Sequence, residues 1–448
     1  MKVKIKNGRV IDPASGEDQI RDLFVADGAI VDPHKAGHEF SADSEIDATD
    51  QIVCPGLIDL QARLREPGEE HKASMQSELA AAIKGGITSV CVPPDTNPII
   101  DTPAMVHMIR QRGRRLEKAR VYPMGALTTG LRGETLTDMA TLKEAGCTVL
   151  GNGDNIIENT LVMRRAMQYA STFNLSVFLT PLDHWLRGNG CVHEGEISTR
   201  LGLPAIPEAA EVVALARDLA LIETTGVRAH ITQISCARSV EKIREAKARG
   251  LNVTAAVSAH HLHLSEQDIG DFDTRYHVLP PLRSLSDRDA LREGVSEGVI
   301  DAICSDHQPH GLDAKLAPFS ESEPGIAGLE TLLSLTLQLV LDGVISLPEA
   351  ISRVTFNPAC ILGIDVGRLS PGAPADVCIF NPSLEQNINV GDFYSQGRNS
   401  PFDGSNLAGQ VTAVIVAGKV VNIYIRCLIP KTLKFDLIKS RAQIFLAF

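Results

Sequence analysis

The chain reads Gly56-Leu57-Ile58-Asp59-Leu60-Gln61-Ala62-Arg63-Leu64-Arg65-Glu66-Pro67-Gly68 where its central part begins. An apolar run ends here in Asp59, and the residues after it alternate in character. A buried strand whose C-terminal end opens into a site has this pattern, as the strands of parallel barrels do. The segment therefore predicts the first strand of a barrel with functional positions directly after it.

The residues between about 55 and 355 alternate between apolar strand candidates and amphipathic helix candidates. The strand candidates are 57–60, 87–92, 119–124, 147–151, 176–180, 227–232, 252–257 and 299–304, and helices are expected at 75–84, 161–172, 209–223 and 240–249 among others. Eight parallel strand–helix units close most simply into a (β/α)₈ TIM barrel, which places the chain in the α/β class. Segment 181–207 is too long for an ordinary loop and is expected to form a lid-like excursion. Segment 325–342 is apolar on nearly all sides, which predicts a helix that is deeply packed or part of an oligomer interface.

The two ends of the chain carry the alternating pattern of antiparallel strands. Residues 1–50 contain Asn7-Gly8 and Asp27-Gly28, residue pairs that favour hairpin turns, and alternation returns at 371–380 and 411–421. We expect both ends to pair into one small β-sandwich, giving domains 1–54, 55–355 and 356–421. Residues 422–448 contain five basic residues and one acid, unlike the rest of the chain. They are interpreted as a loosely packed extension or as a tail that packs on a partner.

Composition excludes several classes of protein. The net charge of −12 disfavours a nucleic-acid or anionic-membrane surface, and no apolar run of about 18 residues occurs. The N-terminus lacks the pattern of a secretory signal. The nine cysteines form no C-x-x-C pair, which fits reduced, mostly buried thiols in a cytoplasmic protein.

Residues 59–68 resemble the dihydroorotase branch of the cyclic amidohydrolases, in which Asp-x-His-x-His-Leu-Arg-(Glu or Asp)-Pro-Gly places two metal-binding histidines on one strand. Six positions agree, namely Asp59, Leu64, Arg65, Glu66, Pro67 and Gly68, but Gln61 and Arg63 occupy the two histidine positions. Framework phrases such as Gly202-Leu203-Pro204 and Phe356-Asn357-Pro358-Ala359 also agree. The resemblance covers about residues 1–421 and implies an amidohydrolase-type barrel with one or two zinc ions on its C-terminal face.

The other metal-ligand positions that this resemblance implies are also substituted. Asn152 stands where a carboxylated lysine or an aspartate is expected, with Asp154 nearby but shifted, and Thr180 and Gln233 replace two histidines. Glutamine is a poor zinc ligand, and an arginine guanidinium has no lone pair to donate. Asp306, the general acid/base position, is the one that clearly remains. The sequence therefore predicts no bound metal.

The substrate positions are changed as well. Arg65 matches the arginine that pairs with the substrate carboxylate, whereas Asp95 and Leu279 replace asparagines. A carboxylate at position 95 would repel an anionic substrate. None of the clustered histidines later in the chain replaces the missing first-strand pair, and we interpret them as structural. They are His260, His261, His263, His307 and His310.

Three functions remain open at this point. The first is a structural subunit, because the sequence resembles the inactive dihydroorotase homologues that accompany aspartate transcarbamoylase. This resemblance implies a non-catalytic chain that forms a hetero-oligomer with the transferase catalytic chain. It also implies a role in pyrimidine biosynthesis and no cofactor. The second is an active zinc-dependent cyclic amidohydrolase that uses Asp306 and an atypical metal site. The third is a small-molecule sensor that binds a pyrimidine precursor through Arg65 without chemistry.

Overall fold

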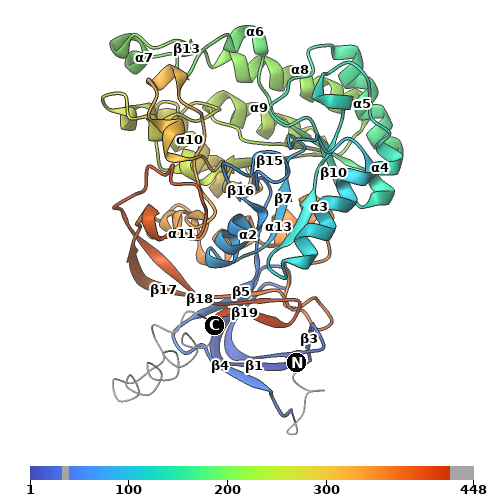
Figure 1. Cartoon of the computed structure of the whole chain (residues 1–448), viewed down its shortest axis with the longest axis vertical. Helices are drawn as coiled ribbons and strands as arrows, with labels where there is room; N and C mark the ends of the chain where they lie inside the picture. Colours follow the sequence, from blue (N-terminus) through green and yellow to red (C-terminus); the bar gives the residue numbers. More distant parts are fainter. Residues whose placement is uncertain (33–39, 424–448) are drawn as a thin grey trace, which may run out of the picture.

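The computed structural model describes residues 1–32 and 40–423, and its centre is a ring of parallel strands (Figure 1). The ring consists of β6 (Leu57–Asp59), β7 (Ile87–Val92), β8 (Arg120–Pro123) with β9 (Gly125–Ala126), β10 (Val149–Gly151), β11 (Ser176–Leu179), β14 (Ala229–Ile231), β15 (Val253–Ser258) and β16 (Ala302–Cys304). Strands β8 and β9 together fill one barrel position, because β8 pairs with β7 and β9 pairs with β10. A parallel bridge between Ala62 and His307 joins the last strand to the first. The predicted (β/α)₈ barrel is confirmed.

Helices cover the outside of this ring. They are α2 (Met75–Lys84), α3 (Pro103–Arg115), α4 (Met139–Ala145), α5 (Thr160–Thr172), α8 (Ala209–Thr225), α9 (Ala237–Ala248), α10 (Leu285–Ser296) and α12 (Leu347–Val354). Helix α13 (Phe356–Leu362) instead packs against side chains inside the ring. Helix α2 shows why the outer helices form where they do. Ser74 caps its first turn, and Met75, Leu79 and Ile83 bury one face against the barrel. Short 3₁₀ turns lie at 129–131, 259–262, 266–269, 274–276, 312–315, 319–321 and 390–392.

The excursion after β11 forms elements of its own. It contains α6 (His184–Arg187), β12 (Val192–His193), α7 (Glu196–Leu201) and β13 (Ala205–Ile206). These elements lie at the end of the barrel farthest from the terminal sheet (Figure 1). A separate apolar cluster made of Cys191, Val192, Ile197, Ile269 and Phe319 ties the excursion to later loops.

The helix expected at 325–342 is shorter than predicted. Helix α11 spans Leu332–Leu341, and residues 325–331 are not helical. Their backbone instead bonds to the loop after β16: Gln308 N donates to Ile326 O, and Gly328 N donates to the His307 ring. Most of α11 is buried and it packs against β18, so deep packing explains its apolar character.

Both chain ends contribute to one connected sheet, as predicted. The strands are β1 (Lys2–Asp12), β2 (Glu17–Ala26), β3 (Ala29–Val31), β4 (Ser44–Asp47), β5 (Ile52–Pro55), β17 (Val377–Asn387), β18 (Asn406–Val416) and β19 (Lys419–Ile423). Their order is β19-β18-β17-β5-β1-β2-β3, with β4 beside β1. The two halves meet where β5 pairs antiparallel with β17, and apolar side chains from both ends form one core.

One of the two expected hairpin turns is wrong. Asp27-Gly28 forms the turn between β2 and β3, with positive φ at both residues. Asn7-Gly8 lies inside β1 as a bulge, where the pairing with β2 shifts. A side chain at position 8 would meet Val53 at 2.4 Å, so this strand requires glycine. Residues 424–448 lie outside the described part, which leaves the interpretation of the 422–448 tail as an expectation. Among the residues described, no helix is long and apolar enough to cross a membrane.

Candidate functional site

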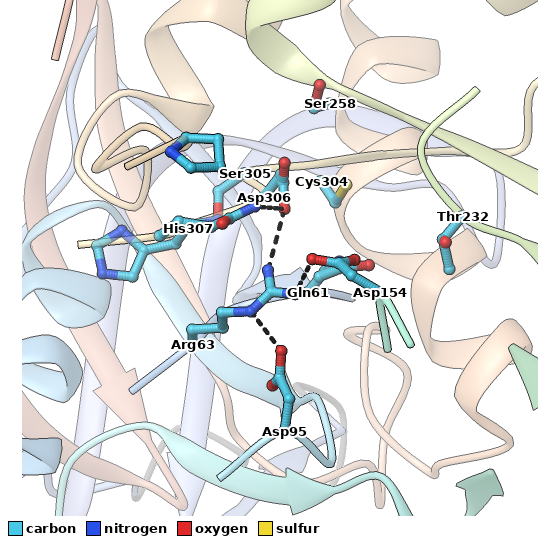
Figure 2. A network of polar contacts seen from close by, with 12 residues as sticks. Gln61, Arg63, Asp95, Asp154, Thr232, Ser258, Cys304, Ser305, Asp306 and His307 are labelled. Carbon is cyan, nitrogen blue, oxygen red and sulfur yellow. Dashed lines mark hydrogen bonds and ion pairs between the residues drawn. The ribbon is translucent and has the colours of Figure 1, made fainter. Parts of the chain in front are cut away.

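Arg63 lies at the centre of the C-terminal mouth of the barrel, just after β6 (Figure 2). Its Nε donates to Asp95 Oδ2 at 2.7 Å, and its Nη2 donates to Asp154 Oδ2 at 2.7 Å. Its Nη1 is 3.7 Å from Asp306 Oδ1. The Arg63 side chain is 6% exposed, whereas those of Asp95 and Asp154 are 22% and 32% exposed. A permanent cation therefore occupies the position from which three carboxylates from different strands can be reached.

Neighbouring carboxylates keep Arg63 charged despite its burial. Burial by itself lowers an arginine pKa, because the charged form loses its hydration. Here the negative charges of Asp154 and Asp95, with a further contribution whenever Asp306 is ionised, outweigh this effect and raise the pKa of Arg63 above its ordinary value. Arg63 is thus an internal counter-ion that the surrounding acids require.

Asp306 is in a different state from its two neighbours. Burial raises the pKa of Asp306 to about 8, and the nearby Arg63 only partly opposes this shift. The distance to Arg63 Nη1 is too long for a hydrogen bond, and that nitrogen has no partner in the described part of the chain. Gln308 donates to Asp306 Oδ1 at 3.1 Å. Asp306 is therefore largely protonated at neutral pH, which is the wrong form for a general base.

The loop after β16 is fixed by buried hydrogen bonds around Asp306. Asp59 accepts bonds from the backbone and hydroxyl of Ser305, and burial raises the pKa of Asp59. His307 Nδ1 accepts from Gly328 N at 3.1 Å, so its proton resides on Nε2, which donates to Glu78 Oε2 at 2.7 Å. Burial opposes ionisation of Glu78, yet the hydrogen bonds it accepts, led by that from His307, hold its pKa below the ordinary value. These contacts give His307 a structural task.

Three more of the substituted positions, Thr180, Gln233 and Leu279, meet at a small pocket beside Arg63. The pocket measures about 10 Å³, about the room for one water molecule, and is lined by Asp154, Thr180, Pro181, Leu182, Gln233, Leu279 and Pro280. Thr180 Oγ1 lies 3.0 Å from Thr232 Oγ1. The side-chain amide of Gln233 is buried, and both of its polar atoms lack partners among the described residues. Leu279 contributes an apolar wall.

Asn152 does not face the site. Its Oδ1 accepts from the hydroxyl and backbone of Thr128, and its Nδ2 donates to Asn155 O. The fourth strand instead supplies Asp154, two residues further on, as the partner of Arg63. Of these two residues, Asp154 and not Asn152 thus joins the charges around Arg63. The one signal available in the sequence was that aspartate is the only ionisable residue between 149 and 155.

Arg65 is held by the chain itself. It donates to Pro309 O at 3.1 Å and to Glu69 Oε2 at 2.8 Å, and its Nη2 lies 3.2 Å from His310 Nε2. Burial, aided by the nearby Arg63, lowers the pKa of Arg65. Its charge is already paired with Glu69, so binding of a substrate carboxylate would require that pair to open.

Two further histidines, His230 and His261, are buried and hydrogen-bonded within the scaffold. His230 contacts Thr254 and the ring of Phe178, and burial lowers its pKa to about 3. His261 lies between Ser258 and the carbonyl of Pro280, and its pKa falls to about 4 for the same reason. Within residues 1–32 and 40–423, no group of three or more His, Cys, Asp or Glu side chains is arranged to hold a metal ion.

The residues present do not fit a zinc centre. Zinc needs several neutral imidazoles, thiolates or carboxylates converging on one point. Here a guanidinium binds the available carboxylates, and Thr180 and Gln233 supply only neutral oxygen and amide groups. A dication beside Arg63 would also be repelled at short range.

Solved structures with this architecture define the class of the fold. The L-hydantoinase (dihydropyrimidinase) from Arthrobacter aurescens superimposes with a TM-score of 0.84 over 94% of this chain and 96% of that one, at 22% identity. A D-hydantoinase structure gives a TM-score of 0.79 at 24% identity, covering 94% and 95% of the two chains. The chain thus has the amidohydrolase fold of these proteins.

Comparison with related sequences identifies the family of this chain, which the fold alone does not. A family model described as dihydro-orotase-like matches residues 50–239. The dihydroorotase-like proteins of Pseudomonas aeruginosa and Pseudomonas putida are both 45% identical, over 94% of this chain and 100% and 99% of their own lengths. A dihydroorotase of Pelotomaculum thermopropionicum is 43% identical over 94% of this chain and 98% of its own. This chain belongs to the dihydroorotase-like family.

Proposed function

We propose that this chain is a catalytically inactive dihydroorotase homologue that acts as a structural subunit of aspartate transcarbamoylase in cytoplasmic pyrimidine biosynthesis. The observation that carries the inactivity is Arg63, buried and ion-paired with Asp95 and Asp154 at the barrel mouth. Membership of the dihydroorotase-like family supports the link with the transferase, which the resemblance of the sequence implied.

The chemistry of the site supports inactivity at each step of a metal-assisted hydrolysis. A metal-bound hydroxide needs a dication, whose position is next to a permanent cation. A general base must be ionised, and burial biases Asp306 toward its protonated form. Substrate binding needs a free cation, and Arg65 is paired with Glu69.

The second candidate is an active zinc-dependent dihydroorotase with an atypical metal site. Two observations favour keeping it. Relatives that are 40–43% identical to this chain carry the name dihydroorotase. Asp154 and Asp306 also face the mouth from two strands. In this reading Arg63 would have to leave its carboxylates when zinc binds.

One sample separates the two candidates. Zinc per subunit is measured in the purified full chain, and dihydroorotate turnover is assayed with zinc added, using the Pelotomaculum relative as the positive control. We expect less than one-tenth equivalent of zinc and no turnover above background. Near-stoichiometric zinc with turnover would overturn the proposed inactivity.

The structural role needs its own experiment. The chain is co-expressed with the transferase catalytic chain from the same genome, and the complex is sized by light scattering. We expect one assembly containing both chains, and we expect the transferase alone to be smaller and less stable or less active. Independent elution of the two chains, with a transferase unaffected by the missing partner, would contradict the subunit role.

A further inference from the structure

A cleft lies far from the barrel mouth, between the barrel and the terminal sheet. It measures about 290 Å³, which is close to the lower end of the size range of small-ligand sites. Helix α3 and the strand after it form one wall, and β18 and β19 form the other. None of its lining residues takes part in the site described above.

The cleft carries an excess of positive charge in a chain whose net charge is −12. Five basic residues line it, and two of them are neutralised: Arg120 pairs with Asp376, and Lys419 pairs with Glu117. The other three are Arg110, Arg114 and Lys118, and none of them forms an ion pair with any described residue. Uncompensated cations in a concave surface raise the local concentration of anions.

Part of this charge is held in place before any ligand arrives. Arg110 Nη1 donates to Ala145 O at 2.6 Å, and the guanidinium lies directly over Gly146. A side chain at position 146 would collide with it, so the glycine at the end of α4 makes room for this arginine. Arg120 is fixed on the opposite side by two bonds to the buried Asp376, which also accepts from Ala417 N. Pre-organised groups of this kind reduce the entropic cost of binding.

The floor of the cleft is apolar. Val121 comes from the barrel strand, and Val416 and Val421 come from the sheet. A free inorganic ion would use only the basic rim, whereas an organic anion would cover the valines as well. We infer that this cleft binds a small organic phosphate, with the phosphate on Arg110, Arg114 and Lys118 and the apolar body on the three valines.

Isothermal titration of the full-length protein with phenyl phosphate tests this assignment, with inorganic phosphate and phenol as reference probes. Saturable one-to-one binding is expected for phenyl phosphate, tighter than for either reference and weaker at higher salt. Arg114 is exposed and Lys118 is half-buried, so both can be replaced without disturbing the core. Arg114→Glu and Lys118→Glu should each weaken the binding of phenyl phosphate about tenfold or more.

Arg115→Glu is the matched control, because Arg115 is exposed on the same helix but does not line the cleft. Binding by this variant should equal that of the unmodified chain. If all three variants weakened the binding of phenyl phosphate equally, the attraction would come from the overall positive charge of the helix, and the proposed site would be overturned. The absence of saturable binding, or equal affinity for phosphate and phenyl phosphate, would also overturn it. None of these results depends on catalytic inactivity or on the transferase.

Discussion

At the scale of single residues, Arg63 determines what the barrel mouth is able to do. It binds Asp95 and Asp154 directly and lies near Asp306, so its removal leaves acids in a partly buried space without a counter-charge. Loss of one partner of a buried ion pair is costly because the other charge stays desolvated. The same residue that excludes zinc is thus expected to stabilise the fold.

Arg63→Met should reduce the free energy of unfolding at pH 7 by about 3 kcal/mol, the lower end of the range for broken buried pairs, since Asp95 and Asp154 are partly hydrated. Urea unfolding followed by circular dichroism measures this loss.

Arg112→Met serves as the control, because the Arg112–Glu66 pair is largely exposed on the Arg112 side and should contribute less than about 1 kcal/mol. An Arg63→Met variant as stable as the unmodified chain would show that the carboxylates need no counter-ion.

Asp306 makes the free energy of unfolding depend on pH, in a direction that follows from its raised pKa. Its pKa is about 8 in the folded chain and has its ordinary value near 4 in the unfolded chain. Between these values the folded state holds a proton that the unfolded state has released, so stability falls as pH rises through this window and levels off above it. Asp306→Asn cannot titrate and should lack this component.

The measurement is the difference in unfolding free energy between the unmodified chain and Asp306→Asn from pH 5 to pH 9. The difference should change steadily in favour of the variant as pH rises. A flat difference would mean that Asp306 is already ionised in the folded protein.

At the scale of elements, helix α2 is tied to the loop after β16. Glu78 on α2 accepts from His307 Nε2 and from the backbone of Gln396, which joins the helix to two distant segments. Because every partner is a donor, both carboxylate oxygens are used, and a side-chain amide cannot satisfy the same set.

Glu78→Gln should therefore lower the free energy of unfolding by about 2 kcal/mol, the cost of leaving a buried donor unpaired. Thermal or urea unfolding is a sufficient measurement. Glu144→Gln on α4 is the control, since Glu144 is exposed. Equal stability of the two variants would contradict the proposed role of the Glu78–His307 contact.

Elements differ in how well the sequence predicts them, for physical reasons. Helix α2 begins and ends at the residues that its amphipathic pattern predicts, and Ser74 caps its first turn. The start of α11 is missed because residues 325–331 are apolar for another reason, namely their backbone pairing with the loop after β16. Hydrophobicity alone does not distinguish a buried loop from a buried helix.

The candidate site, like helix α11, could be predicted only in part from the sequence. Alignment of strand ends indicates that Gln61, Arg63, Thr180 and Gln233 belong near the mouth, because each follows a barrel strand. It does not reveal that Arg63 bonds to residues 32 and 91 positions away, nor that Asn152 turns toward Thr128. Those contacts depend on the path of loops, which local sequence patterns do not determine.

At the scale of the whole molecule, the two chain ends hold the barrel between them. Strand β5 leads into β6, and it pairs with β17, which follows the last barrel helix. The two halves of the terminal sheet therefore pair only once the barrel residues between them have been synthesised, and the core of the sheet contains residues from both halves. The alternating patterns at 1–50 and 371–421 were sufficient to predict this pairing.

The intact protein should be indifferent to metal removal. Dialysis against EDTA should leave the melting temperature of the full chain unchanged, and added zinc should not raise it, because a ligand stabilises only the state that binds it. Scanning calorimetry measures both, with the Pelotomaculum relative, which is named dihydroorotase, as a reference. A fall of several degrees in EDTA that zinc reverses would contradict the structural account of Arg63.

The buried guanidinium also bears on how cells can use this protein. A metalloenzyme with the same fold becomes active only after it has bound its metal ion, so the number of active molecules depends on the supply of that metal. Here the positive charge belongs to an arginine side chain and is therefore present as soon as the chain has been synthesised. A protein built in this way should fold equally well during zinc starvation and zinc sufficiency.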